Sequence, residues 1–416
     1  METLENKDRI VQILGSFGVG IQSITEYRGN ALTLYEVKPQ DGIRISKIRN
    51  LKDEIAVSLG VRSVRIIAPT EDGKVGIEVP NKERTTVTCG EIFNSWVFQN
   101  TDMELPIALG KTATGEIFMA DLAEMPHLLV AGATGQGKSV CLNMILMSLL
   151  RKKSPDDIHL VLIDPKKVEF DIYSRLLGTY LGAPEIITET DKAEKALEDT
   201  CRIMDDRYRI LAKAGVRNIK EYNALHPDNK MQYGIIIIDE YGDLIMTGGK
   251  TMEQYICRIA QKARAVGLHM IVSTQRPSAT IVTGNIKANF PTRIAFRTTT
   301  GTDSRVIIDQ MGAEKLTGKG DMLFFCGSEV TRIQGAYVSI GEVSSELDRI
   351  ASEYADYVDA YCEELKRQEY DNVNQFEIAE REEALAIEGM RKERKEKSER
   401  WLESIRRKMR EKYGED

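Results

Sequence analysis

The chain has 416 residues, a formal net charge of −7, 42% hydrophobic residues and 29% charged residues, values typical of a soluble globular protein with roughly two or three domains. No apolar run is long enough for a transmembrane helix, and the charged N-terminus lacks a signal-peptide pattern, so we expect a cytoplasmic protein. The cysteines and histidines are scattered without metal-site or redox spacing. The net charge neither indicates nor excludes binding to nucleic acid.

Residues 1–87 are predicted to form a small α+β subdomain. Its helix-like and strand-like segments cover residues 7–17, 31–37, 45–59, 63–68 and 75–79. No catalytic group of residues is evident in this part, so we expect a structural or assembly module.

Residues 88–343 alternate strand-like and helix-like segments, which predicts a parallel sheet with crossover helices. The expected strands are residues 105–109, 116–121, 158–163, 235–238, 270–273, 293–296 and 322–325. The longest expected helices are residues 193–214 and residues 252–266, the second ending at Gly267.

A glycine-rich loop follows the apolar run at residues 128–130 and precedes an apolar helix-like segment. Its GxxxxGKS spacing is that of a phosphate-binding loop. The glycines let successive N–H groups face phosphate oxygens, Lys138 reaches the β- and γ-phosphates, and the Ser139 hydroxyl ligates Mg²⁺. The alternative is a chance glycine-rich turn, against which the flanking strand and helix argue. We therefore predict ATP and Mg²⁺ as ligands of Gly132, Ala133, Thr134, Gly135, Gln136, Gly137, Lys138 and Ser139.

Two further polar pairs follow expected strands. Asp239 comes directly after four isoleucines and is predicted to join the Mg²⁺ shell, while Glu240 is predicted to orient or deprotonate the attacking water. This pairing favours a RecA-like ATPase over a small-molecule kinase, the alternative being an incidental acidic pair. Thr274 and Gln275 end the next strand, where a polar side chain would lie beside the γ-phosphate; a turn-forming pair is the competing interpretation.

Residues 344–416 are predicted to form a charged helical tail. Ser345 and Asp348 resemble a helix N-terminal capping box, and Trp401 belongs to a thin apolar stripe near the end. Both signs of charge are interspersed, which favours a solvated single helix or a weak coiled coil over a dedicated nucleic-acid arm.

Several segments resemble the motor of the FtsK/SpoIIIE family of double-stranded DNA translocases. They include HLLVAGATGQGKSV, LIDPKKVEF, IIIIDEYGDLI and DSRVIIDQMGAEKLTGKGDML, and the upstream RISKIRNLKDEIAVSLGVRSVRIIAP is similar to that family's α subdomain. The resemblance covers roughly residues 5–340. It implies an α/β fold with a RecA-like P-loop motor, and a homo-hexameric ring around duplex DNA that hydrolyses ATP between neighbouring subunits.

The resemblance also implies roles for individual residues. Arg264 matches the arginine finger, which acts on the neighbouring subunit's nucleotide, and Gln275 matches the sensor position. Arg276, Lys287 and Arg305 match loop positions that contact DNA phosphates.

The chain also departs from the family pattern. Gly301 stands where the family commonly has a lysine, a loss for which Arg297 is a candidate substitute. We expect the family's membrane-spanning N-terminal region and C-terminal winged-helix γ domain to be absent, with the charged tail in place of the latter.

The function that we expect is ATP-dependent translocation of duplex DNA, in chromosome partition or in the handling of mobile-element DNA. One alternative is a related ring ATPase of conjugation or secretion that moves single-stranded DNA or protein. The other is a nucleotide-regulated scaffold whose tail recruits a protein partner.

Overall fold

The computed structural model describes residues 5–68, 73–181 and 186–358. The chain separates into two compact units, Met1–Glu353 and Tyr354–Asp416, and the features below belong to the first. Most of the expected tail, including Trp401, lies outside the described residues, so its helical character stays a prediction. Within the described ranges, no helix combines the length and the apolar character needed to cross a membrane.

The N-terminal part contains a four-stranded antiparallel sheet with the order β1-β2-β4-β3. Its elements are α1 (Asn6–Ser16), β1 (Ile21–Arg28), β2 (Leu32–Pro39), α2 (Ile45–Asn50), α3 (Lys52–Leu59), β3 (Arg65–Ile67) and β4 (Val75–Pro80). The helices cover one side of this sheet, where Ile10 and Ile55 pack in a core with Val37 and Ile77.

Sequence patterns predicted this part well except at two points. The helix expected over residues 45–59 is divided in two at Leu51, whose φ of −89° and ψ of 12° depart from helical values. Strand β1 was not predicted. It lies at the sheet edge with no fully buried residue, so its sequence lacks the apolar alternation of a half-buried strand.

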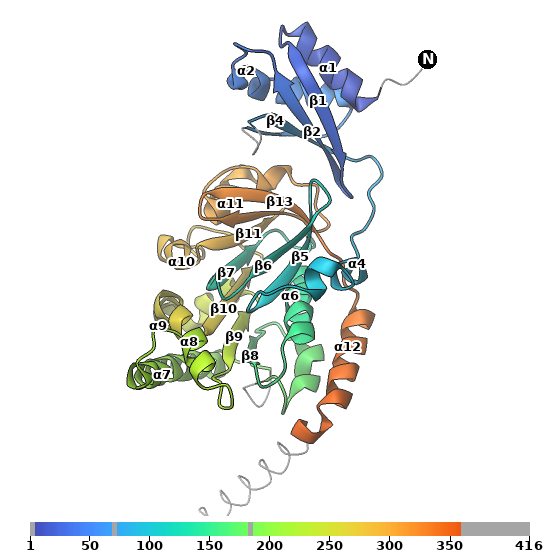
Figure 1. The fold of residues 1–416 in the computed structure, drawn as a ribbon. Helices are drawn as coiled ribbons and strands as arrows, with labels where there is room; N and C mark the ends of the chain where they lie inside the picture. Colours follow the sequence, from blue (N-terminus) through green and yellow to red (C-terminus); the bar gives the residue numbers. More distant parts are fainter. Residues whose placement is uncertain (1–4, 69–72, 182–185, 359–416) are drawn as a thin grey trace, which may run out of the picture. The chain divides into compact units, whose positions relative to one another are not determined.

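The part expected to be the motor, residues 88–343, is called the motor part. It is built on a nine-stranded sheet with the order β6-β5-β13-β12-β11-β7-β10-β9-β8 (Figure 1). The strands are β5 (Pro106–Thr112), β6 (Ile117–Asp121), β7 (His127–Ala131), β8 (Ile158–Ile163), β9 (Tyr233–Ile238), β10 (Leu268–Thr274), β11 (Thr292–Phe296), β12 (Asp321–Cys326) and β13 (Glu329–Gly335). The seven strands listed from the sequence are all present, the apolar run at residues 128–130 before the phosphate loop forms β7, and β13 is an additional strand.

The sheet is mixed, so the expectation of a parallel sheet is wrong for one half. Strands β8, β9, β10, β7 and β11 run parallel, whereas β12, β13, β5 and β6 pair antiparallel with their neighbours. The reason is local, because tight turns connect β5 to β6 and β12 to β13, and such turns join only antiparallel strands.

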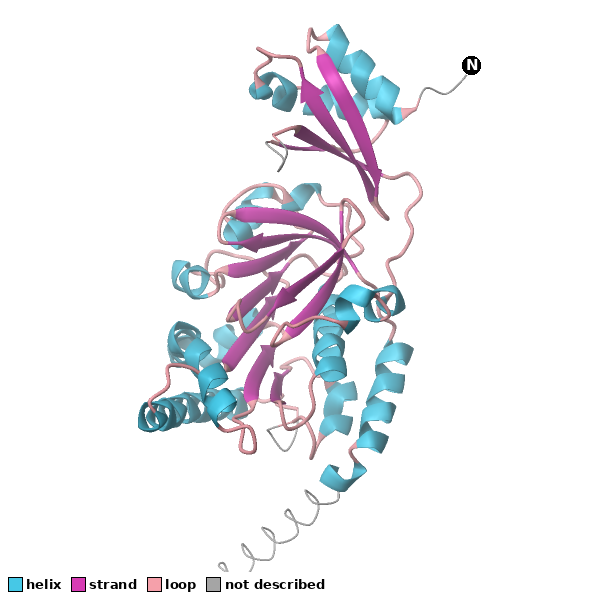
Figure 2. Cartoon of the chain, viewed as in Figure 1, coloured by secondary structure: helices cyan, strands magenta, loops and turns pink. Residues whose placement is uncertain are grey.

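Helices cover both faces of the motor sheet (Figure 2). On one face lie α7 (Thr190–Ala214) and α9 (Tyr241–Lys262), whose apolar side chains share a core with β9 and β10. On the other face α6 (Lys138–Lys152) packs beside α12 (Ile340–Glu353). Continuous apolar runs such as Tyr233–Ile238 are therefore buried from both sides, as expected for central parallel strands.

Five short helices were not predicted, because each is too short for a periodic apolar pattern. They are α4 (Cys89–Phe93), α5 (Trp96–Gln99), α8 (Ile219–Leu225), α10 (Gly284–Asn289) and α11 (Gly301–Ile308). Each begins after a capping side chain that accepts a backbone hydrogen bond: Thr88, Ser95, Asn218, Thr283 and Thr300.

The start of α12 differs from the expected capping box at Ser345 and Asp348, which both lie inside the helix. The box is formed by Ser339 and Glu342, since the Ser339 hydroxyl accepts from the Glu342 amide and the Glu342 carboxylate accepts from the Ser339 amide. The expected domain boundary at residue 344 also falls inside this helix, which packs against the motor.

Candidate active site at the carboxyl edge of the sheet

Three neighbouring parallel strands bring the expected site residues to one edge of the sheet. In the register, Ala131 of β7 pairs with Thr274 of β10, and Ile238 of β9 pairs with Val272. The phosphate loop, Gln275 and the Asp239–Glu240 pair each begin directly after one of these strands. Parallel strands end at the same edge, so segments far apart in sequence meet there.

Close packing at Gly132 and Gly137, and positive φ angles at Gly135 and Gly137, explain the glycines of the phosphate loop. A Cβ atom on Gly132 would lie 2.5 Å from the Cβ of Phe296, and one on Gly137 would lie 2.9 Å from the backbone of Gly320. Gly135 and Gly137 also have positive φ angles, 75° and 117°. Larger residues at these positions would distort the loop that is expected to cradle phosphates.

Lys138 is buried at the first turn of α6 and points to the end of β9. Its Nζ lies 2.8 Å from Oδ1 of Asp239 and 3.3 Å from the hydroxyl of Ser273, which itself donates to the same carboxylate oxygen at 2.7 Å. The side chains of Lys138 and Asp239 are 4% and 1% exposed, so the charge pair lies within the protein. Ser273 was not singled out from the sequence.

Glu240 has a left-handed backbone, with φ 52° and ψ 61°, at the junction of β9 and α9. Such a conformation costs about 1–3 kcal/mol in a residue other than glycine and is common at functional sites. The fully buried carboxylate accepts hydrogen bonds from the Thr274 hydroxyl at 2.8 Å and the Gln275 amide at 3.2 Å. Several donors therefore hold it in one orientation.

Lys166 is a further partner of Glu240 that sequence reasoning missed. Its Nζ lies 3.0 Å from Oε2 of Glu240 and 3.4 Å from Asp243. Partial burial opposes the charge on Lys166, but the two carboxylates outweigh this effect and raise its pKa above the ordinary value. The sequence placed Lys166 shortly after the strand expected over residues 158–163, but its pairing with Glu240 depends on β8 and β9 ending at the same edge.

Glu169 in the same loop contacts the phosphate loop. The Ser139 hydroxyl donates to Oε1 of Glu169 at 2.5 Å. The loop is held by buried Asp164, whose carboxylate accepts from the backbone amides of Lys166, Val168, Glu169 and Phe170. Glu169 is therefore positioned to fix the orientation of the Ser139 hydroxyl.

The oxygen atoms at this edge suit a magnesium ion. Mg²⁺ prefers hard oxygen ligands, and the Ser139 hydroxyl and the Asp239 carboxylate are such groups. The Lys138 and Ser273 donors both contact Oδ1 of Asp239, so the other carboxylate oxygen is the better candidate ligand. The Ser139 hydroxyl donates its hydrogen bond to Glu169, so the lone pairs of the Ser139 oxygen point elsewhere and remain available to a metal ion. The residues present thus fit the expected ion.

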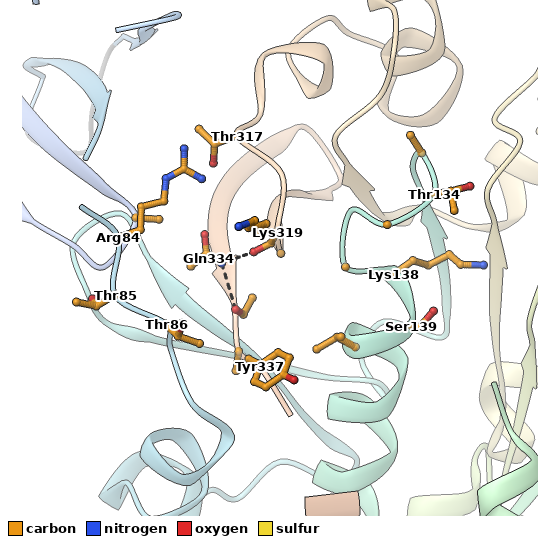
Figure 3. Close-up of a pocket in the computed structure, with 18 of the residues that line it drawn as sticks. Arg84, Thr85, Thr86, Thr134, Lys138, Ser139, Thr317, Lys319, Gln334 and Tyr337 are labelled. Atoms are coloured by element: carbon orange, nitrogen blue, oxygen red, sulfur yellow. Dashed lines mark hydrogen bonds between the residues drawn. The ribbon is translucent and has the colours of Figure 1, made fainter. Parts of the chain in front are cut away.

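The structure also brings Gln275 to the phosphate loop. The Thr134 hydroxyl donates to Oε1 of Gln275 at 2.7 Å, linking the end of β10 to the loop after β7. A cavity of about 900 Å³ opens beside the loop and includes Gly135, Lys138, Ser139 and Gln275 in its wall (Figure 3).

Comparison with known proteins agrees with this geometry. Residues 90–279 match the FtsK/SpoIIIE family, and residues 1–81 match the FtsK alpha domain. The chain is 44% identical to the DNA translocase FtsK of Clostridium acetobutylicum, over 93% of this chain and 51% of that protein. It is 42% identical to the DNA translocase SpoIIIE of Bacillus subtilis, over 84% of this chain and 46% of that protein. The chain belongs to the FtsK/SpoIIIE family. It spans about half the length of the curated relatives it matches.

Solved structures show the same fold at lower identity. The pCW3 conjugation coupling protein TcpA, a monomer form with ATPgS, aligns over 84% of this chain and 99% of its own, with a TM-score of 0.59 and 24% identity. The cytoplasmic domain of the Thermomonospora curvata type VII secretion ATPase EccC aligns over 64% of this chain and 34% of its own, with a TM-score of 0.56 and 22% identity. The expected P-loop ATPase motor fold is confirmed.

Arg264, expected to match the family's arginine finger, lies at the amino ends of the parallel strands, opposite the carboxyl edge that carries the phosphate loop. It belongs to the short 3-10 helix η2 (Ala263–Val266) before β10, and its guanidinium lies 3.0 Å from Glu124, just before β7. The phosphate loop follows the far end of β7, five residues or roughly 16 Å away. Both side chains of this ion pair are more than half exposed. Arg264 is therefore directed away from its own chain's phosphate loop.

Three residues of this chain match positions at which the FtsK/SpoIIIE family is expected to contact DNA. They lie on separate elements. Arg276 follows Gln275 at the carboxyl edge and is 60% exposed. Lys287 of α10 pairs with Asp309 at 2.6 Å, and Arg305 of α11 has a guanidinium nitrogen 3.1 Å from the sulfur of Met311. Their roles stay predictions.

Proposed function

We propose that this chain is an ATP-hydrolysing motor that moves duplex DNA. The observation that carries the proposal is the convergence of Lys138, Asp239, Glu240 and Gln275 at the carboxyl ends of β7, β9 and β10. Family membership supports DNA as the substrate, because the relatives are DNA translocases. The site of action would be the cytoplasm, in chromosome partition or mobile-element transfer.

Each residue at this edge has a distinct chemical task. The amides of the phosphate loop and Lys138 would bind the triphosphate, and Ser139 and Asp239 would hold Mg²⁺, which would supply positive charge for the phosphate oxygens. Glu240 accepts a hydrogen bond from the attacking water and orients it toward the γ-phosphate. Its buried carboxylate is already fixed by Thr274 and the Gln275 amide, so little reorganisation is needed.

Gln275 offers a route from nucleotide to DNA. Its side chain contacts Thr134 of the phosphate loop, and the next residue along the chain is the exposed Arg276. A change in the γ-phosphate position would shift Gln275 and with it Arg276. Arg276, together with Lys287 and Arg305, would contact backbone phosphates and provide grip without sequence preference.

The position of Arg264 supports action between subunits. A residue at the amino edge of the sheet does not reach its own γ-phosphate, but head-to-tail packing of copies places the amino edge of one subunit against the carboxyl edge of the next. Repetition of this contact closes a ring, which we propose to be a homo-hexamer around DNA. The tail is a candidate site for a protein partner.

Mixing two inactive variants tests this arrangement. Arg264→Ala removes the finger but leaves the carboxyl-edge site intact, and Glu240→Gln removes the water-orienting carboxylate but leaves the finger intact. Each protein alone should hydrolyse ATP slowly in the presence of duplex DNA. In an equal mixture, random assortment gives about a quarter of the interfaces one intact site and one intact finger. The ATPase rate of the mixture should therefore recover to about a quarter of the rate of the unaltered chain.

A matched control is Arg258→Ala, which removes an exposed arginine of α9 that pairs with Asp205 at 2.7 Å. This variant should retain its activity without a partner. If the mixture of Arg264→Ala and Glu240→Gln shows only the average of the separate activities, Arg264 does not complete a neighbour's site and the ring proposal is wrong.

A further inference from the structure

The cavity beside the phosphate loop extends to the segment that joins the N-terminal sheet to the motor. Its volume is about 900 Å³, and the phosphate loop forms only part of its wall. Another part is lined by residues of the connecting segment and of the chain after β13, namely Asn81, Arg84, Thr85, Thr86 and Tyr337. Figure 3 shows Tyr337 and Thr86 on one side of this space and Lys138 on the other.

Tyr337 presents an aromatic ring whose backbone is fixed. Its amide donates to the carbonyl of Val87 at 2.8 Å, and its carbonyl accepts from the amide of Cys89 at 2.9 Å. The side chain is 51% exposed, so the ring is accessible to a ligand. A rigid backbone holding a half-exposed ring at a cavity wall is suited to stacking against a flat ligand.

The connecting segment is tied to the N-terminal sheet at its other end. The Asn81 amide donates to Ala31, and the Thr85 amide donates to Asn30, whose side chain in turn donates to the Thr85 hydroxyl at 2.9 Å. A ligand at this end of the cavity therefore contacts a segment anchored both in the N-terminal sheet and beside Tyr337.

We propose that Tyr337 and the connecting segment at residues 81–87 form the subsite for the purine base of the nucleotide. The inference rests on the proposed function, because it assumes that the phosphates bind at Lys138 and Ser139. A nucleotide anchored there extends its uncharged base away from the loop, and the cavity continues toward Tyr337. Base stacking on the ring would place the connecting segment in contact with the nucleotide, so that the N-terminal part responds to its binding.

The test compares two ligands that share phosphates but differ in the base. The affinities of the full chain for ATP and for inorganic tripolyphosphate, both with Mg²⁺, are measured by calorimetry. Tyr337→Ala should weaken ATP binding roughly 5- to 150-fold, the range for losing one base-stacking contact, and leave tripolyphosphate binding unchanged. Tyr337→Phe keeps the ring and should bind ATP within about twofold of the unaltered chain.

A phosphate-loop variant separates the failure of this inference from failure of the proposed function. Lys138→Ala should weaken both ligands. If Lys138→Ala weakens both while Tyr337→Ala leaves ATP binding unchanged, or weakens both ligands equally, the base subsite is refuted and the phosphate site stands. If Lys138→Ala changes neither affinity, the phosphate site itself is wrong.

Hydrogen exchange gives a second readout that does not depend on variants. Backbone amides of residues 81–87 should exchange more slowly when ATP is bound than when tripolyphosphate is bound, because only ATP carries the base. Equal protection of this segment by the two ligands would contradict its contact with the base.

Discussion

The ammonium group of Lys166 lies 3.0 Å from Oε2 of Glu240, which joins the loop after β8 to the residue that we propose orients the attacking water. Glu240 is fully buried, whereas Lys166 is 36% exposed, so the lysine brings a counter-charge from the surface to a carboxylate inside the protein. Its raised pKa keeps Lys166 charged at neutral pH. The pair is thus part of the candidate active site.

Replacing Lys166 with methionine should reduce kcat for ATP hydrolysis roughly tenfold and change KM little. The carboxylate of Glu240 would keep the Thr274 and Gln275 donors but lose one constraint on its orientation, a loss felt mainly in the chemical step. Steady-state kinetics provide the measurement. Lys167→Met, at the exposed neighbouring position, is the matched control and should leave both constants unchanged; equal effects of the two substitutions would refute the role of Lys166.

Glu169 should influence magnesium binding through Ser139. Partners that orient a metal ligand typically contribute about 10- to 100-fold to metal affinity, so Glu169→Ala should raise the half-saturating Mg²⁺ concentration for ATP binding by about tenfold or more. Glu169→Gln keeps an oxygen that accepts the hydrogen bond from the Ser139 hydroxyl and should show a smaller effect. A titration of ATP binding against Mg²⁺ decides the matter, and an unchanged midpoint for Glu169→Ala would argue against this role.

Acid should destabilise the fold through three histidines, of which His127 and His269 are fully buried and His159 is partly buried. Burial lowers the pKa of His159 and His269 to about 4 and that of His127 to about 3, with a further contribution to His127 from nearby His269. In the unfolded chain these groups titrate near pH 6.5, so between about pH 6.5 and about pH 4 the unfolded state binds more protons. The stabilisation is complete above about pH 6.5 and is lost as pH falls, by roughly 1 kcal/mol per pH unit for each histidine.

Urea unfolding at a series of pH values measures this dependence. His127→Asn provides a matched variant, because the asparagine oxygen can accept the Met270 amide hydrogen bond that the His127 ring accepts. The free energy of unfolding of this variant should fall less steeply with acid. An unfolding free energy that stays constant from about pH 7 to about pH 4.5 would contradict the prediction.

The parts of the site that follow a single strand could be predicted from the sequence. Lys138 and Ser139 are in one short motif, and Asp239 and Glu240 directly follow an apolar run, so the local pattern carries the chemistry. Lys166, Glu169 and Ser273 could not be assigned in this way, because their importance comes from partners far away in the chain. Lys166, for example, is 74 residues from Glu240.

In the fold, too, features set by local sequence patterns were predicted, and features set by pairing between distant segments were missed. Helix α7 and strand β9 have strong periodic or continuous apolar patterns and were expected close to their observed positions. The antiparallel half of the sheet was missed because strand direction depends on pairing, which apolar patterns do not encode. The beginning of α12 was misplaced because Ser345 and Asp348 imitate the pattern that Ser339 and Glu342 actually form.

The most direct test of the central claim is the ATPase rate of the full chain with and without duplex DNA. We predict strong stimulation by duplex DNA, weaker stimulation by single-stranded DNA, and loss of the stimulated rate in Glu240→Gln. Equal rates with and without duplex DNA, or a stimulated rate that survives Glu240→Gln, would contradict the assignment of this chain as a duplex-DNA motor.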